Sequence, residues 1–286
     1  MGHNRIDSLK QSFLALFLLC FVYVGVFSLA SLTSIWWLGC LFETGAVALV
    51  CVVNGRALVC RGAPRDYSIS WKPTKETLPA LLFLPFFVGV VILLSLGTNY
   101  LSQLWGYAGA YDYGDNMWVC LFSSALLPAV LEEMFCRYIF LPRLTVYSRS
   151  GGILAASLFF AFLHGNFVQI PYAFLAGLFL GTLAVVCRSI FPCVIFHFVN
   201  NTASILLHFY EGTLLPTILL YTLVAALVIC GVGIFCLRKK IRAALHPLVA
   251  KDEVQPLEGG VVVGRLFTSP LVFFFLLFLI EACLRF

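Results

Sequence analysis

Apolar residues recur along the chain in long runs, separated by short stretches that hold most of the charged residues. A helix needs ~20 mostly apolar residues to cross a bilayer, and the runs have about this length. The pattern predicts spanning helices over residues 12–31, 35–54, 78–97, 117–141, 152–170, 171–187, 189–209, 213–236 and 267–284. Because the stretch 152–187 can also be divided differently, we expect an all-α polytopic transmembrane bundle of eight or nine helices.

The composition supports this class of protein. The 286 residues are 62% hydrophobic and only 11% charged, whereas soluble domains are ~45–50% apolar and ~25% charged. This balance excludes a soluble globule and a disordered chain. The first apolar run follows Arg5 and Lys10 as in a signal peptide, but its length and the helices after it favour an uncleaved first helix.

Basic residues follow every second predicted span. Arg5 and Lys10 precede the first span, and the later groups are Arg56, Arg61, Arg65, Lys72, Lys75, Arg143, Arg149, Arg188, Arg238, Lys239, Lys240 and Arg242. The alternate loops nearly lack Lys and Arg. Since cytoplasmic loops are enriched in these residues, the pattern predicts a multi-pass protein with a cytoplasmic N-terminus. The net charge of +5 therefore reflects topology, and we expect no nucleic-acid partner.

Eleven cysteines are present, most of them inside apolar runs, and no two have the spacing of a zinc ribbon or a redox motif. We interpret them as small buried hydrophobic residues.

Several polar residues stand inside the predicted spans, where they are costly. They are Glu132, Glu133 and Arg137 in the fourth span, His164 in the fifth, and His197 and Asn201 in the seventh. At 1.5 Å per residue, most lie about 14–20 Å from the basic end of their helix. Three helices thus carry polar groups to a similar depth, which indicates one buried polar chamber.

The spacing within the fourth span separates two roles. Glu133 and Arg137 are four residues apart and can form an ion pair on one helix face. Glu132 is turned ~100° from Glu133, so one carboxylate can be structural while the other faces the chamber. Pro128 precedes Glu132 by one turn and predicts a kink beside the site.

A buried carboxylate, two imidazoles and a carboxamide favour hydrolysis. A carboxylate can take a proton from water, and a histidine and an asparagine amide can stabilise an oxyanion. His197 and Asn201 share one helix surface. The same residues also fit a site with two histidines and a glutamate around a divalent metal such as zinc. The sequence leaves open whether a metal or none is used, although the lack of HExxH excludes a zincin.

Three motifs carry a resemblance to a known family. They are the EExxxR motif of Glu132 to Arg137, the FxxxH motif of Phe160 to His164, and the HxxxN motif of His197 to Asn201. In this order and inside apolar spans, they resemble the CAAX protease and bacteriocin-processing (CPBP, or Abi) family of intramembrane proteases, which includes type II CAAX prenyl proteases. The resemblance covers residues 120–208, and the stretch 177–201 is more similar to bacterial members.

The resemblance implies an intramembrane endopeptidase that cleaves a membrane-associated substrate near the cytoplasmic face. Glu132 and His164 would activate water, while His197 and Asn201 would stabilise the oxyanion. Glu133 and Arg137 would hold the helix and tune the site. The implied surroundings are membrane lipid, a peptide or lipidated protein substrate such as a CAAX-type prenylated tail, and a bacterial plasma membrane.

On this interpretation the chain has three parts. Residues 1–116 form N-terminal transmembrane helices, 117–210 a catalytic CPBP-like helical core, and 211–286 C-terminal transmembrane helices. The stripe Ala173, Gly177 and Gly181 predicts close helix packing.

Other classes of protein share some of these features. A non-catalytic membrane regulator or bacteriocin-immunity protein of the same fold is the main alternative. A transporter would show internal symmetry, which is not visible. Asp112 and Asp115 lie in a polar loop without the Gly-x-Gly-Asp of an aspartyl protease. Asn200 is a neighbour that could replace Asn201, and Glu43 is left unassigned.

Overall fold

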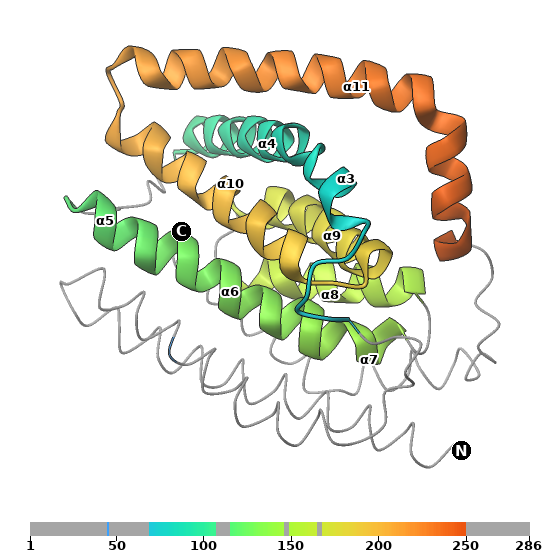
Figure 1. Ribbon diagram of the computed structural model, residues 1–286. Helices are drawn as coiled ribbons and strands as arrows, with labels where there is room; N and C mark the ends of the chain where they lie inside the picture. The colour runs from blue at the N-terminus through green and yellow to red at the C-terminus, as the bar shows by residue number, and fades with distance from the viewer. Residues whose placement is uncertain (1–44, 46–68, 107–114, 146–148, 165–167, 250–286) are drawn as a thin grey trace.

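A computed structural model describes residues 45, 69–106, 115–145, 149–164 and 168–249 of the chain (Figure 1). Its regular elements in these segments are all helices, which confirms the all-α class. The predicted spans 12–31, 35–54 and 267–284, together with Glu43 and Asp112, lie outside the described residues.

The fold begins with a short helix and a long one, α3 (Thr77–Leu81) and α4 (Leu84–Leu104). A continuous helix from 117 to 145 follows, built from α5 (Met117–Cys120), η2 (Leu121–Leu126), α6 (Leu127–Glu133), η3 (Met134–Phe140) and α7 (Leu141–Thr145). In η2 and η3 the backbone is a wider π-helix. The last four helices are α8 (Arg149–Leu163), α9 (Ile170–Cys187), α10 (Phe191–Phe209) and α11 (Leu214–Val249).

Within the described residues, four stretches are long and apolar enough to cross a membrane: Thr77–Leu104, Met117–Phe140, Ile170–Cys187 and Leu214–Cys236. They confirm four of the predicted spans in outline. Helix α10 agrees in extent with the predicted span 189–209, although its polar residues keep it out of this apolar class. The number eight or nine for the whole chain stays a prediction.

The prediction for the fifth span was wrong at its C-terminal end. Helix α8 has 15 residues and ends at Leu163, whereas the sequence pattern extended the span to residue 170. The next residues in the sequence, Gly165 and Asn166, are poor helix formers. His164 therefore follows the last turn of α8 instead of lying within a span.

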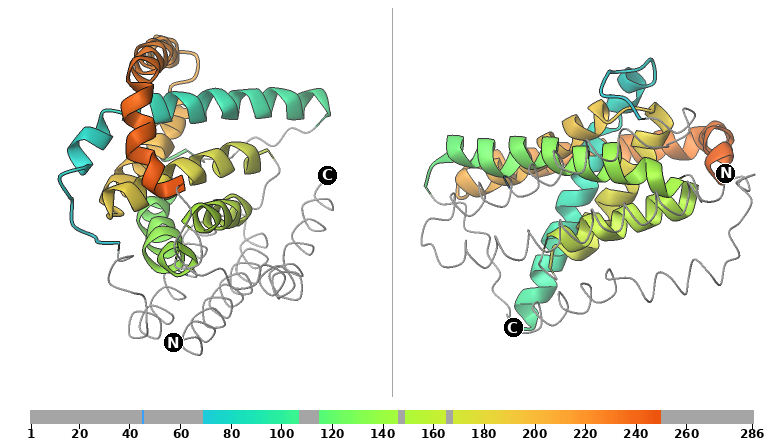
Figure 2. Two further views of the ribbon diagram at one scale, coloured as in Figure 1. Left: turned by 90° about the vertical axis from the view of Figure 1, so that its right-hand side faces the viewer. Right: turned by 90° about the horizontal axis from the view of Figure 1, so that it is seen from below.

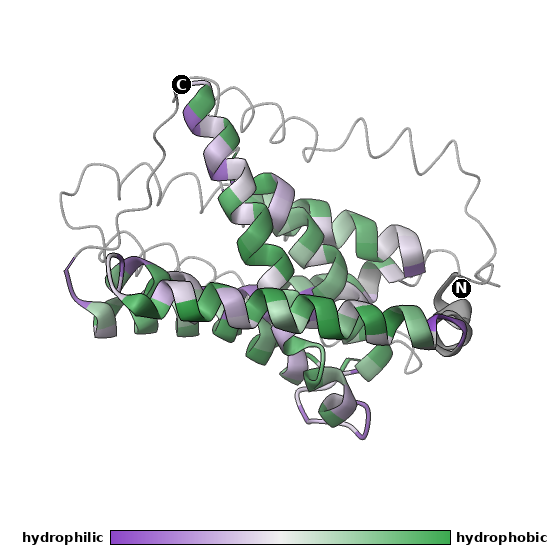
Figure 3. Cartoon of the chain, turned by 90° about the horizontal axis from the view of Figure 1, so that it is seen from above, coloured by the Kyte–Doolittle hydropathy of each residue, from purple (hydrophilic) through white to green (hydrophobic). Residues whose placement is uncertain are grey.

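The long helices pack around α10, which crosses between α4 and α11 on one side and the helix 117–145 on the other (Figures 1 and 2). Helix α9 lies against α8, α4 and α10. Seen from above, the helices are apolar over most of their length, and polar residues gather at helix ends and connections (Figure 3). This surface suits a lipid environment.

Helices α8 and α9 approach closely because glycine lines their contact. A Cβ atom on Gly177 would lie 3.0 Å from the Cα atom of Ser157, and one on Gly181 would lie 3.2 Å from Cγ2 of Ile153. Ala173 in the same stripe is buried. The predicted small-residue packing is thus confirmed.

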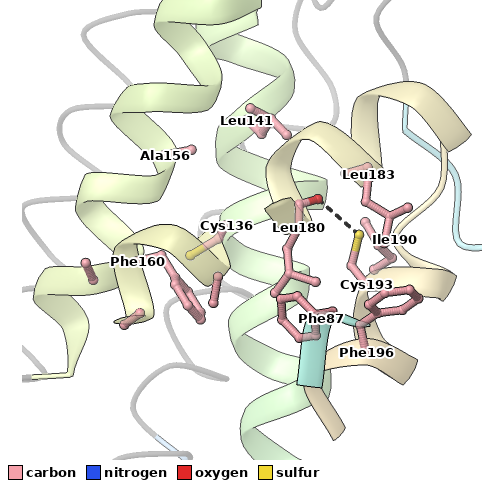
Figure 4. Packing of buried hydrophobic residues seen from close by; sticks show 14 of the residues in the cluster. Phe87, Cys136, Leu141, Ala156, Phe160, Leu180, Leu183, Ile190, Cys193 and Phe196 are labelled. Carbon is pink, nitrogen blue, oxygen red and sulfur yellow. Dashed lines mark hydrogen bonds between the residues drawn. The ribbon is translucent and has the colours of Figure 1, made fainter. Parts of the chain in front are cut away.

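The core beside this contact is apolar and includes buried cysteines. Figure 4 shows Phe87, Leu180 and Phe196 packed together, with the thiol of Cys193 donating to the carbonyl of Leu180 at 3.3 Å. Cys136 and Cys193 are fully buried and no disulfide involves them. For these residues, the interpretation of cysteine as a small buried hydrophobic residue is confirmed.

The segment before α3 forms hydrogen bonds with the connection between α9 and α10. The Ser70 amide donates to the Arg188 carbonyl and the Ile190 amide to the Ser70 carbonyl, both at 2.9 Å. The Ser189 hydroxyl donates to the Lys72 carbonyl at 2.8 Å. Arg188 has a φ of 49°, so the chain turns sharply there before α10 begins. These bonds fix where α10 starts, and with it the depth of the polar residues it carries.

Candidate active site

A buried ion pair forms the centre of the polar cluster. Arg137 Nη1 donates to Glu133 Oε1 at 2.9 Å, and their side chains are 1% and 0% exposed. His197 Nδ1 donates to the same Glu133 oxygen at 2.9 Å. Arg137 Nη2 also reaches the Gly177 carbonyl at 3.4 Å. One carboxylate therefore links the helix 117–145 to α10, and one guanidinium links it to α9.

The ring of Phe160 packs against three of the polar side chains. The Arg137 guanidinium carbon lies 4.2 Å from the ring centroid. The imidazoles of His164 and His197 contact the ring edge-on, with centroids 5.0 and 5.6 Å away. A cation over an aromatic face and edge-on ring contacts are both favourable. The phenylalanine of the FxxxH motif thus sets the positions of both histidines and the arginine.

The hydrogen bond of His164 fixes which of its nitrogens carries the proton. Nδ1 lies 2.9 Å from the Phe160 carbonyl, and a carbonyl oxygen can only accept. Nδ1 is therefore the donor, and Nε2 of the neutral ring remains an acceptor. Such a nitrogen can accept a hydrogen bond from one of the O–H groups of a water molecule.

Glu132 lies beside this histidine and outside the ion pair. The charges of Glu132, His197 and Arg137 all act on the His164 imidazole, with Glu132 contributing most among them. Its Oε2 atom is buried and has no hydrogen-bond partner among the described residues. An uncompensated carboxylate oxygen is costly in a low-dielectric setting. The Glu132 Oε2 atom is therefore available to take a proton or bind a water molecule.

Asn201 is held by two hydrogen bonds. Its Nδ2 donates to the Ser124 carbonyl at 3.1 Å, and its Oδ1 accepts from Asn200 Nδ2 at 3.3 Å. These partners decide the orientation of the amide, since a carbonyl can only accept. The second N–H of Nδ2 remains as a further donor. Asn200 therefore supports Asn201.

The structure brings Arg137 and His197 into contact with the same Glu133 oxygen, and His164 contacts the Phe160 ring that also packs against both of them. Glu132 acts on His164 through its charge. Asn201 is one turn of α10 beyond His197 and is tied to η2 through Ser124.

Three features were not foreseen from the sequence. The Glu133–His197 bond joins residues 64 positions apart, and no spacing rule links them. The Ser124 carbonyl is a backbone group, so its residue type gives no signal. Phe160 is part of the FxxxH motif, and its place in that motif was the available signal for its packing role.

The candidate site residues that the structure describes do not come together as a metal site. Within the described ranges, no three His, Cys, Asp or Glu side chains come close enough together to hold a metal ion. The Glu133 oxygen that faces His197 already accepts from two donors. The alternative of two histidines and a glutamate around a metal therefore does not fit this arrangement, and we derive no step through a metal.

Comparison with known proteins agrees with the motifs. Residues 114–203, about a third of the chain, match the family model described as type II CAAX prenyl endopeptidase Rce1-like. This match confirms the family resemblance found in the three motifs, all of which lie inside the matched segment. No curated protein and no solved structure gives a significant match.

Proposed function

We propose that the protein is an intramembrane endopeptidase that hydrolyses a peptide bond in a membrane-associated substrate. The Rce1-like match over 114–203 supports a CAAX-type intramembrane protease in general. The single observation that carries the specific proposal is the buried Glu132 oxygen, which has no hydrogen-bond partner among the described residues and whose charge acts on His164, a histidine whose Nε2 is an acceptor. These are the two groups that activation of a water molecule requires.

In the proposed first step, a water molecule donates one hydrogen bond to Glu132 and the other to His164 Nε2. Glu132 takes a proton as the water oxygen attacks the scissile carbonyl carbon. The electrons of the C=O bond move to the oxygen, which becomes the oxyanion. Glu132 then delivers the proton to the leaving nitrogen while the oxyanion reforms the C=O bond and the C–N bond breaks. A carboxylic acid and an amine are released, and the acid then loses its proton to water.

The oxyanion would be stabilised by His197 and Asn201. Asn201 offers its second Nδ2–H. His197 donates Nδ1–H to Glu133, so its Nε2 can donate to an oxyanion only when the ring is positively charged. Glu133 orients the His197 ring through this hydrogen bond, and Arg137 holds the Glu133 carboxylate in place. Glu133 and Arg137 are in this account positioning residues, because they act through His197.

The substrates we propose are peptides or lipidated proteins, with CAAX-type prenylated tails as one class. An apolar chain segment or lipid would keep such a substrate in the bilayer beside the helices. We further propose that cleavage takes place near the cytoplasmic face of a bacterial plasma membrane. The basic loops predict the orientation of the chain, and the family resemblance implies the face and the kind of membrane.

The test uses purified protein in proteoliposomes and a panel of quenched fluorescent peptides, prenylated and unmodified. We expect cleavage by wild type and a loss of about a hundredfold or more in Glu132→Gln, since a general base contributes ~10²–10⁴-fold. Glu211→Gln, at an exposed glutamate just after α10, is the matched control and should cleave normally.

Two outcomes would contradict the proposal. Glu132→Gln with full activity would exclude Glu132 as the base. Folded wild type that cleaves no peptide in the panel would instead favour a non-catalytic membrane regulator.

A further inference from the structure

Helix α10 carries two consecutive asparagines, and one backbone carbonyl orients both of their amides. The Ser124 carbonyl can only accept, so the group that donates to it at 3.1 Å is Nδ2 of Asn201. The other end of that amide, Oδ1, accepts from Asn200 Nδ2 at 3.3 Å. The Asn200 amide is therefore oriented with its nitrogen toward Asn201, and its oxygen is the end that this chain of bonds leaves unused.

This Asn200 oxygen is an acceptor without a donor. Oδ1 is buried and has no hydrogen-bond partner among the described residues. The Ser204 hydroxyl, one turn further along α10, donates to the backbone carbonyl of Asn200 at 3.2 Å and not to this oxygen. A buried amide oxygen without a donor is costly. The arrangement indicates a ligand that brings its own N–H group.

The position of this acceptor relates it to the candidate active site. Asn200 is next to Asn201 and three residues after His197, and residues three apart are neighbours on a helix surface. Asn201 has a second Nδ2–H to donate, and Asn200 has Oδ1 to accept. The two amides together present one donor and one acceptor, which is what one residue of a β-strand presents to the residue opposite it.

We infer that Asn200 is a substrate-binding residue, whose Oδ1 accepts the backbone N–H of the substrate residue that contributes the scissile carbonyl. This inference rests on the proposed function, in which Asn201 donates to the oxygen of that carbonyl. In an extended peptide, the N–H and C=O of one residue point to the same side, so the two asparagines can bind both. The ligand class is an extended peptide backbone, whose N–H needs a partner inside a membrane.

The test removes the N–H from the substrate and the oxygen from the protein in turn. It uses a peptide that wild type cleaves in proteoliposomes. A second peptide has a backbone ester in place of the amide just before the residue that contributes the scissile carbonyl. The ester removes one N–H and leaves the scissile bond unchanged. The masses of the products show whether both peptides are cleaved at the same bond.

We expect the ester to lower kcat/KM about fivefold in wild type, which corresponds to one neutral hydrogen bond. In Asn200→Ala the amide and ester peptides should have nearly equal kcat/KM, because the acceptor is gone. Asn200→Asp keeps an acceptor oxygen, but its ionised carboxylate cannot donate to Asn201. This variant should cleave more slowly and still prefer the amide.

Two controls define the specificity of the effect. An ester one residue earlier removes an N–H that points to the opposite side of an extended peptide, so its effect should be the same in wild type and in Asn200→Ala. Asn99→Ala is the matched control on the protein, at an asparagine of α4 that donates to the Ser95 carbonyl at 2.8 Å. It should keep the wild-type preference for the amide.

The outcomes separate this inference from the proposed function. Equal cleavage of both peptides by wild type, or an unchanged preference in Asn200→Ala, would overturn the inference, while the cleavage itself would support an endopeptidase. Loss of the preference in both Asn200→Ala and Asn200→Asp would also overturn it, because the effect would then pass through Asn201. Folded wild type that cleaves no peptide would contradict the proposed function and the inference together.

Discussion

The buried ion pair between Glu133 and Arg137 makes a sharp prediction about stability. Arg137→Met keeps much of the side-chain volume and removes the charge. The Glu133 carboxylate then stays buried with His197 as its remaining partner, and its Oε2 atom already has no hydrogen-bond partner among the described residues. Breaking a buried pair by removing one partner costs ~3–5 kcal/mol.

The magnitude follows from the geometry of the pair. At 2.9 Å and an effective dielectric constant of ~20, the Coulomb attraction is about 6 kcal/mol. Desolvation offsets part of this attraction when both charges are present. When one charge is removed, the desolvation cost of the other remains, which is why the loss approaches the upper part of the range.

The double variant Glu133→Gln/Arg137→Met separates charge from packing. It removes both charges and leaves an amide oxygen that can still accept from His197 Nδ1. We expect it to recover most of the lost free energy of unfolding, to within about 2 kcal/mol of wild type, because replacing a whole buried pair is often nearly neutral.

The assay is reversible unfolding in mixed micelles by SDS titration, followed by far-ultraviolet circular dichroism. Equal losses in the free energy of unfolding in Arg137→Met and in the double variant would refute the reasoning. The unpaired, buried Glu133 carboxylate would then not be the cause of the loss. Cleavage should stay impaired in the stable double variant, because the His197 Nδ1–H would donate to a neutral amide oxygen instead of a carboxylate.

Three further outcomes are expected. In Glu133→Gln cleavage should fall, because the His197 Nδ1–H would donate to a neutral amide oxygen instead of a carboxylate; unchanged cleavage would show that this hydrogen bond does not affect the rate. Gly177→Ala should cost ~1–3 kcal/mol in unfolding, since its Cβ would lie 3.0 Å from the Cα atom of Ser157, whereas Gly231→Ala has nothing within 4 Å and should not destabilise; equal effects would contradict the packing argument. Cleavage should survive dialysis against a metal chelator, because no three metal-ligating side chains come together in the part of the chain that the structure describes; activity lost on dialysis and restored by zinc would show a metal enzyme.

The sequence predicted the helical class, and it also singled out the candidate site residues, because both leave strong local signals. Runs of apolar residues define spans by length alone, and Glu132, His164 and His197 are conspicuous inside them. The error in the predicted spans also has a physical cause. Hydropathy averaged over a long window does not register a helix end at Leu163, because the apolar residues on both sides outweigh His164 and Asn166, so the fifth span was drawn too long.

The partners within the site could not be predicted. Counting residues from the basic helix ends gives depth along an axis, but it does not give rotation about that axis. The Glu133–His197 bond depends on how two helices are rotated against each other, and the π-helical segment between Met134 and Phe140 changes that rotation. Glu133 was therefore expected to pair with Arg137, which it does, while its contact with His197 emerged from the fold.

Product analysis in heavy-oxygen water tests the central claim most directly. Wild-type protein and Glu132→Gln are incubated in proteoliposomes with a prenylated and an unmodified peptide, and the products are weighed by mass spectrometry. The account predicts cleavage at one peptide bond by wild type, with a heavy oxygen atom in the new carboxylate, and almost no product from Glu132→Gln. Labelled product formed equally well by Glu132→Gln would contradict the account, because water would then be activated by another group.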